Sequence, residues 1–220
     1  MKGVAKVRTI SQLYTIALPR ALKAYHRYLI FAAILFTTCI VVGYRGYHPA
    51  PDGALPWAFK GLVTLAHSME GKGFWVKVAM IFGNNLRITM ISVALGWLLG
   101  LVPLAGICMN GVAIGMMSRL MTLQESWTVG MAIASFLPHG LFELPAFIAG
   151  QSIGLRIGFL APLVWRRKYS SADLGRAVAE GATILGLFVV PMLALAALIE
   201  LTITPALIRA MSPGFPTIPL

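Results

Sequence analysis

The chain carries no charged side chain between Arg87 and Arg119. An α-helix crosses about 30 Å of hydrocarbon with roughly 20 residues, so this interval is too long for one membrane-spanning helix. Gly100 and Pro103 interrupt the run near its middle, since both residue types disfavour a continuing helix. We therefore expect two spans here, over residues 74–102 and 104–120, joined by a short turn.

Three further stretches are long and apolar enough to cross a bilayer. They cover residues 28–44, 127–163 and 174–201, and the second is long enough to be bent or broken at Pro138. Because 58% of the residues are hydrophobic and only 11% are charged, most of the apolar surface must face lipid. The expected fold class is all-α: an integral membrane helical bundle with about five transmembrane helices, two of them long or broken.

Basic residues gather beside the spans in two groups. The first group precedes the first span and the second lies between the fourth and fifth: Lys2, Lys6, Arg8, Arg20, Lys23 and Arg27, then Arg166, Arg167, Lys168 and Arg176. Five spans put both groups on one side of the membrane, as the positive-inside rule requires, so we expect a cytoplasmic N-terminus. Membrane topology thus explains the net charge of +11, and no nucleic-acid partner is expected.

Two segments outside the spans have amphipathic patterns. Residues 10–25 mix apolar and basic side chains around Pro19, which predicts a kinked cytoplasmic surface helix. In residues 57–69 apolar side chains recur at helical spacing before Gly71, which predicts an external interfacial helix. For both segments, a helix packed on the bundle is an equal alternative. The expected organisation is a basic segment, 1–27, followed by one transmembrane domain, 28–220.

The common motifs of soluble catalysis are missing from the sequence. It has no HExxH, no Walker lysine loop and no paired CxxC. Its two cysteines, Cys39 and Cys108, lie inside apolar runs and are expected to be small core residues instead of a disulfide. These patterns predict no catalytic residue, no metal and no cofactor.

Polar side chains inside the spans are the informative ones, because an unpaired ionisable group at the bilayer centre costs roughly 2.5 to 3.5 kcal/mol. The candidate intramembrane polar core comprises Asn84, Asn85, Arg87, His139, Glu143 and Gln151. His139 and Glu143 are four residues apart and so share one helix face, and Gln151 continues that stripe two turns later. We expect this stripe to look inward, toward the asparagines and Arg87 of the neighbouring span.

Three interpretations of His139 and Glu143 remain open. They could form a buried hydrogen-bonded pair that fixes helix register. They could instead belong to a proton or ion pathway, since intramembrane His and Glu commonly carry protons. A metal site with hydrolytic chemistry would need a third ligand, and the other histidines lie outside the predicted spans.

Small residues repeat every four positions in several spans, which permits close helix approach in lipid. The candidate packing residues are Gly96, Gly100, Gly111, Gly115, Ala146, Gly150, Gly154 and Gly158. We expect these helices to pack within the chain, with a dimer contact as the alternative.

Four other polar residues have simpler explanations. Asn110 is expected to cap a helical turn, and Asp173 to cap the entry to the fifth span. Arg156 and Glu200 are expected to extend toward the two membrane surfaces from the ends of their spans.

Three segments together resemble the stage II sporulation protein M family, also called the domain-of-unknown-function 95 family. They are Phe82-Gly-Asn-Asn-Leu-Arg-Ile-Thr89, Asn110-Gly111, and the run from Leu137 to Gly150 that contains His-Gly-Leu-Phe-Glu-Leu-Pro. The resemblance covers residues 75–208. It implies a multi-pass helical protein of a bacterial or archaeal plasma membrane, without established enzymatic activity, whose polar residues map onto Asn84, Asn85, His139 and Glu143.

The leading hypothesis is a non-enzymatic membrane protein that acts as a scaffold or organises the membrane. Its partners would be the lipid bilayer and proteins bound within it, or other copies of the chain. One alternative is a small transporter or channel that uses the His, Glu and Asn site, since broken helices often build substrate sites. Another is an intramembrane metal-dependent hydrolase.

Overall fold

The computed structural model describes residues 9–49, 59–123 and 129–211, and every element in these ranges is helical. Along the chain come α1 (Ile10–Gln12), the π-helix η1 (Leu13–Ala17), α2 (Leu18–Gly46), α3 (Lys60–Met69), α4 (Phe74–Ala94), α5 (Leu101–Leu123), α6 (Val129–Trp165), α7 (Ser171–Ile184), the π-helix η3 (Leu185–Val189) and α8 (Val190–Met211). The expected all-α membrane bundle is confirmed.

Four helical stretches of the described chain are long and apolar enough to cross a membrane. They are Ile10–Gly46, Leu101–Leu123, Ala134–Trp165 and Ser171–Met211. They correspond to the first, third, fourth and fifth predicted spans. The second predicted span forms α4, a helix of 21 residues that also carries Lys77, Asn84, Asn85 and Arg87. Helix α4 is not one of the four stretches, because these polar side chains lower its mean hydropathy.

The break in the long uncharged interval comes earlier than expected. Helix α4 ends at Ala94, a turn follows, and α5 begins at Leu101. Leu99 and Gly100 both have positive φ, of 55° and 74°, so the chain reverses just before α5. Pro103 lies in the first turn of α5, where its missing N–H costs no helical hydrogen bond.

The N-terminal segment forms a helix that continues directly into α2, whereas a separate surface helix was expected over residues 10–25. The predicted irregularity near Pro19 is a π-helix, in which the Leu18 N–H donates to the Leu13 carbonyl. Segment η3 repeats the arrangement, with Pro191 following its last residue at the same spacing. A proline ring clashes with the carbonyl four residues before it, and a widened π turn relieves such a clash.

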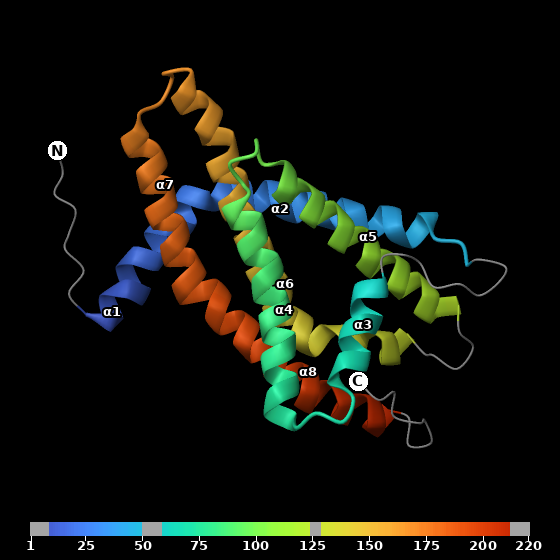
Figure 1. Cartoon of the computed structure of the whole chain (residues 1–220). Coiled ribbons are helices and arrows are strands. Elements are labelled where there is room, and N and C mark those ends of the chain that lie inside the picture. The colour runs from blue at the N-terminus through green and yellow to red at the C-terminus, as the bar shows by residue number, and fades with distance from the viewer. Residues whose placement is uncertain (1–8, 50–58, 124–128, 212–220) are drawn as a thin grey trace.

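Helix α6 pairs with the continuous helical run of α7, η3 and α8 as a long hairpin, and α2 lies beside α5 (Figure 1). Helix α6 is bent and contains Pro138, Pro145 and Pro162. Helix α4 packs against both α6 and α8. The largest core cluster joins α2, α6, α7, η3 and α8: Leu18, Ala21, Tyr25, Ala146, Ala149, Ile153, Ile184, Val189 and Leu193.

Glycines let α6 approach α4 closely. A Cβ at Gly154 would meet the Ser92 carbonyl oxygen, and one at Gly158 would meet the backbone of Gly96 and Gly100. Gly150 lies against the Thr89 side chain. The backbones of α4 and its following turn therefore rest directly on α6, which only glycine allows.

A second glycine contact joins α5 to α2. A Cβ at Gly111 would lie 2.7 Å from the Cys39 Cβ, and one at Gly115 would meet the Ile40 carbonyl oxygen. Gly43 of α2 packs in the same way on Val112 of α5. The glycine repeats thus serve helix packing within this chain.

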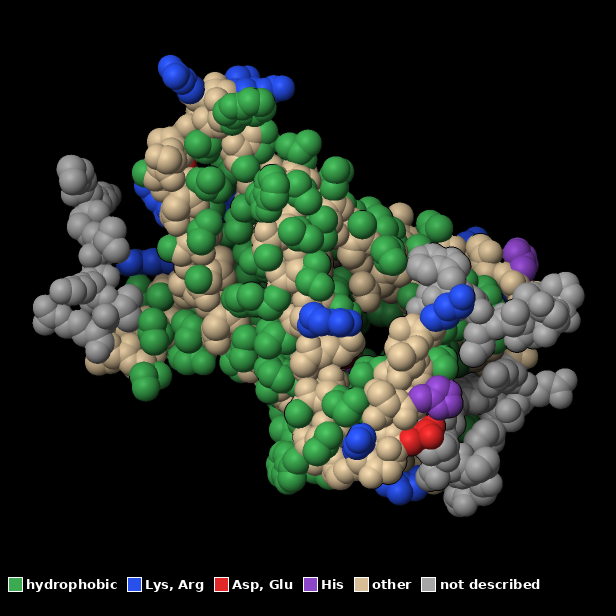
Figure 2. All heavy atoms as spheres, in the orientation of Figure 1, with side chains coloured by type: hydrophobic (Ala, Val, Ile, Leu, Met, Phe, Trp, Pro, Cys, Tyr) green, Lys and Arg blue, Asp and Glu red, His purple; other side chains and the backbone are tan. Residues whose placement is uncertain are grey.

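The outer surface of the bundle is largely apolar. Figure 2 shows many hydrophobic side chains over the described helices, with several Lys and Arg at one end of the molecule and single cations elsewhere on this face. Ile30, Ile34, Val42 and Leu141 are each more than half exposed. Side chains of this kind on long helices are typical of a surface that faces lipid.

Candidate functional site

The first polar cluster lies between α6 and α8, which run antiparallel. The His139 Nδ1 is 3.4 Å from the Thr204 Oγ1, and Thr204 is only 3% exposed. One turn further along α6 is Glu143, and one turn back along α8 is Glu200. These two carboxyl groups are close enough to interact electrostatically. The cluster therefore combines a His–hydroxyl contact with two nearby carboxyl groups.

This arrangement has a definite chemical capacity. A histidine and two carboxyl groups within an apolar layer are side chains of the types that carry protons or cations. The contact of His139 with Thr204 is at the long limit of a hydrogen bond, so it orients the imidazole without fixing it tightly. Both glutamates are only half-buried, which leaves them partly accessible.

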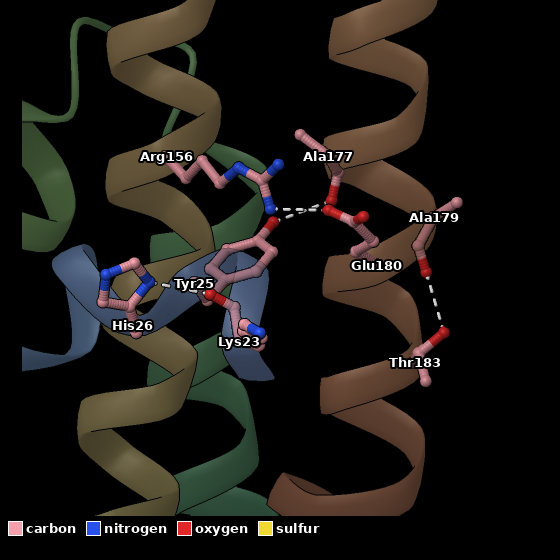
Figure 3. Close-up of polar contacts among 8 residues, drawn as sticks. All are labelled: Lys23, Tyr25, His26, Arg156, Ala177, Ala179, Glu180 and Thr183. Atoms are coloured by element: carbon pink, nitrogen blue, oxygen red, sulfur yellow. Dashed lines mark hydrogen bonds and ion pairs between the residues drawn. The ribbon is translucent and has the colours of Figure 1, made fainter. Parts of the chain in front are cut away.

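The second polar cluster joins α2, α6 and α7 (Figure 3). The Arg156 Nη1 donates to the Glu180 Oε2 at 2.6 Å, and the Arg156 Cζ lies 4.4 Å from the centroid of the Tyr25 ring. The Tyr25 hydroxyl donates to the Ala177 carbonyl oxygen at 2.7 Å. Tyr25 is fully buried, so its hydroxyl needs such a partner.

This second cluster ties three helices at one point. The ion pair bridges α6 and α7, and the cation–π contact together with the tyrosine hydrogen bond attaches α2 to both. Gly181 completes the site, because a Cβ there would lie 2.9 Å from the Tyr25 hydroxyl oxygen and 2.8 Å from the Ile153 Cγ2. A larger residue at Gly181 would push Tyr25 away from α7.

Gln151 is fully buried, and neither atom of its amide group has a hydrogen-bond partner among the described residues. Its Oε1 lies 3.0 Å from the point where a Cβ on Gly106 would stand, and Ser92 Oγ lies 3.4 Å from the same point. The amide thus sits where α4, α5 and α6 meet. It does not belong to either of the two clusters described above.

The expected joint core of all six polar residues is not what the structure shows. His139 bonds to Thr204 of α8, and the Asn84 side chain donates to Asn85 within α4, at 3.4 Å. Arg87 is exposed on α4 and points away from the core. The α8 residue Thr204, which the sequence analysis did not consider, replaces the asparagines as the partner of His139.

Several single-residue expectations are also corrected. Arg156 is paired with Glu180 and does not extend to a membrane surface, and Glu200 lies half-buried on α8, one turn from Thr204. The Asn110 amide donates to the Gly106 carbonyl oxygen one turn earlier in α5, so it caps no helix end. Asp173 does contribute to a helix cap. It forms a capping box with Ser170, which is the N-cap residue of α7.

The sequence pattern did not predict the contacts of Tyr25, Glu180 and Thr204. A usable signal existed for Glu180, because Arg156 and Glu180 are opposite charges in two apolar helices joined by a short connection. Tyr25 and Thr204 gave no comparable signal, since aromatic and hydroxyl side chains occur throughout such helices. Their roles depend on helix crossings that only the structure reveals.

No group of three His, Cys, Asp or Glu side chains comes together in a metal-binding arrangement among the residues that the structure describes. The first polar cluster contains three such residues, His139, Glu143 and Glu200, and the second contains one, Glu180. The three of the first cluster do not converge on one point.

Comparison with family models gives one match. Residues 29–205 match the model of the stage II sporulation protein M family, which extends the resemblance seen in residues 75–208 to include most of α2. Comparisons with curated proteins and with solved structures found no match.

Proposed function

The chain belongs to the stage II sporulation protein M family, and from that premise we propose that this membrane protein is a non-enzymatic scaffold that assembles partner proteins or organises the bilayer. We place it in the plasma membrane of a bacterium or archaeon, with a cytoplasmic N-terminus. This orientation takes α4 as the second of five spans, which puts the basic residues before α2 and after α6 together on the cytoplasmic side.

One observation carries the proposal: the polar groups within the helices are used to join helices. Arg156 bonds to Glu180 and Tyr25 bonds to Ala177, so α2, α6 and α7 are locked together. The glycine contacts do the same for α4 with α6 and α5 with α2. A rigid bundle with an apolar exterior is suited to presenting a fixed surface to membrane partners.

The test uses Glu143→Gln in the native host membrane. We expect the wild-type chain, extracted in a mild detergent, to migrate in a complex larger than its own 23.7 kDa. Glu143→Gln should alter the amount or size of that complex. In a separate assay, the purified wild-type chain should move no ions across proteoliposomes. A monomeric wild-type chain in every detergent tested would contradict the scaffold role.

A second candidate, a small transporter or channel, is favoured by the polar cluster between α6 and α8, where Glu143 and Glu200 each lie one turn from the His139–Thr204 contact. Carboxyl groups inside an apolar layer are the type of group that carries protons or cations. Under this alternative, wild-type proteoliposomes show a proton or cation flux. Glu143→Gln then abolishes the flux, and the chain remains folded and fully assembled.

The hydrolase hypothesis requires a bound metal at a fixed ratio to the chain. The described residues offer it no three-ligand group. Metal analysis of the purified protein tests it directly, and a reproducible one-to-one content of zinc or another transition metal would revive it.

A further inference from the structure

Two groups of exposed cations lie at one end of the bundle. The first is a stripe on α2, formed by Arg20, Lys23 and Arg27, which recur at helical spacing and are all exposed. This basic stripe lies on the opposite face of α2 from Leu18, Ala21 and Tyr25, which are buried in the core. The start of α2 is therefore amphipathic, with its cations turned away from the bundle.

The second group is the connection between α6 and α7. Arg166, Arg167 and Lys168 are exposed there, and Figure 2 shows cationic side chains projecting from this end of the molecule. Two aromatic side chains flank this basic tip: Trp165 is 87% exposed and Tyr169 is 49% exposed. Exposed Trp and Tyr next to Arg and Lys are typical of a membrane–water interface.

A direct contact places the stripe and the tip on the same side. Tyr25 lies within the stretch of α2 that carries the stripe, and its hydroxyl bonds to the Ala177 carbonyl oxygen at 2.7 Å. Helix α7 begins at Ser171, so Ala177 is only about 10 Å along the helix from the basic tip. Both groups can therefore contact one membrane surface.

The acidic residues near this end do not neutralise these cations. The Asp173 carboxylate accepts hydrogen bonds from the backbone N–H and the hydroxyl of Ser170, and Glu180 is bonded to Arg156. In residues 9–49, 59–123 and 129–211, no ion pair joins a cation of the stripe or the tip to an acid. The positive charge of this end is thus available to an external anion.

We propose that the basic stripe and the basic tip together bind the phosphate-bearing headgroups of anionic phospholipids on one face of the membrane. The flanking Trp165 and Tyr169 favour a lipid headgroup over an acidic protein, because they would lie at headgroup level when α6 and α7 cross the bilayer. This surface depends only on membrane insertion, so it stands whether the chain is a scaffold or a transporter.

The experiment uses the full chain in a neutral detergent, with phosphatidylglycerol or phosphatidylcholine added. Native mass spectrometry counts the bound lipids, and thermal unfolding gives the stabilisation at each lipid concentration. We expect phosphatidylglycerol to bind more tightly than phosphatidylcholine and to raise the unfolding temperature more. High salt should weaken the binding.

Three variants locate the site, and each removes three charges. They are Arg20→Gln/Lys23→Gln/Arg27→Gln for the stripe, Arg166→Gln/Arg167→Gln/Lys168→Gln for the tip, and Arg45→Gln/Lys60→Gln/Lys72→Gln as an exposed control away from both. The stripe and tip variants should each lose roughly tenfold or more in apparent affinity for phosphatidylglycerol, and the control should retain it.

Other outcomes would overturn the proposal. The cations would not select lipid charge if phosphatidylcholine bound as tightly as phosphatidylglycerol, or if the control variant lost as much affinity as the other two. Competition by millimolar inorganic phosphate would point to a free-anion site. Tighter binding of a polyglutamate peptide than of phosphatidylglycerol would point to an acidic protein partner.

Discussion

The Arg156 guanidinium and the Glu180 carboxylate, joined at 2.6 Å, form an ion pair between α6 and α7 that is largely shielded from solvent, with side-chain exposures of 15% and 26%. Removing one partner leaves the other charge unpaired in apolar surroundings, which costs more than a surface pair ever contributes. We expect Arg156→Ala to lower the free energy of unfolding by about 2 to 3 kcal/mol, measured by thermal or chemical unfolding in detergent.

The matched control for this pair is His67 with Glu70, at 2.9 Å but with side chains 71% and 57% exposed. Glu70→Gln should change the stability by less than about 0.5 kcal/mol. Replacing both members of the buried pair, as Arg156→Met/Glu180→Leu, should restore part of the loss. If the single and double variants were equally unstable, the pairing would not be the cause.

The glycine contacts give a second prediction. A Cβ at Gly158 would meet the backbone of Gly96 and Gly100, which cannot yield as a side chain can. Gly158→Ala should therefore separate α6 from the turn after α4 and destabilise the protein by about 1 to 3 kcal/mol. Gly83→Ala, where nothing lies within 4 Å, should be neutral or slightly stabilising. Unfolding curves of the two variants, measured under the same conditions, test this difference in stability.

The sequence predicts those parts of the fold that local forces determine. The lengths of the apolar stretches predicted where the helices lie, because the thickness of the hydrocarbon layer sets how long a spanning helix must be. For example, α6 ends at Trp165, close to the predicted residue 163. Proline also marks the two irregular helical segments, since η1 and η3 both precede a proline. The turn before α5 was misplaced, because Leu99 adopts a positive φ that its residue type does not announce.

The polar contacts were harder to predict than the helices. Four-residue spacing correctly put His139 and Glu143 on one helix face, but spacing within a helix does not identify the neighbouring helix. Helix α8 supplies Thr204 and Glu200 to that face, and the asparagines of α4 are not the partners of His139. Long-range partners of this kind depend on helix crossings, which one sequence without relatives does not encode visibly.

The thiols of Cys39 and Cys108 give a third prediction, on the contact of α2 with α5. The two side chains lie close enough to interact, and Gly111, one turn after Cys108, packs directly on Cys39. A thiol oxidant such as copper phenanthroline should therefore link them within one chain. The linked chain should be two hydrogens lighter by mass spectrometry and should resist alkylation, and Cys39→Ser should abolish both effects.

The contact of His139 with Thr204 gives the last prediction, because it fixes how α6 meets α8. Thr204→Val keeps the shape of the side chain but removes the hydroxyl that lies 3.4 Å from the His139 Nδ1. The bond is long, so we expect a loss of only about 1 kcal/mol in the free energy of unfolding. Thr202→Val on the same helix is the control, since the exposed Thr202 hydroxyl donates only to the Leu198 carbonyl of its own helix. An equal effect of the two variants in thermal unfolding would mean that His139 gains nothing from α8, and that the glycine and ion-pair contacts alone hold α6 in place.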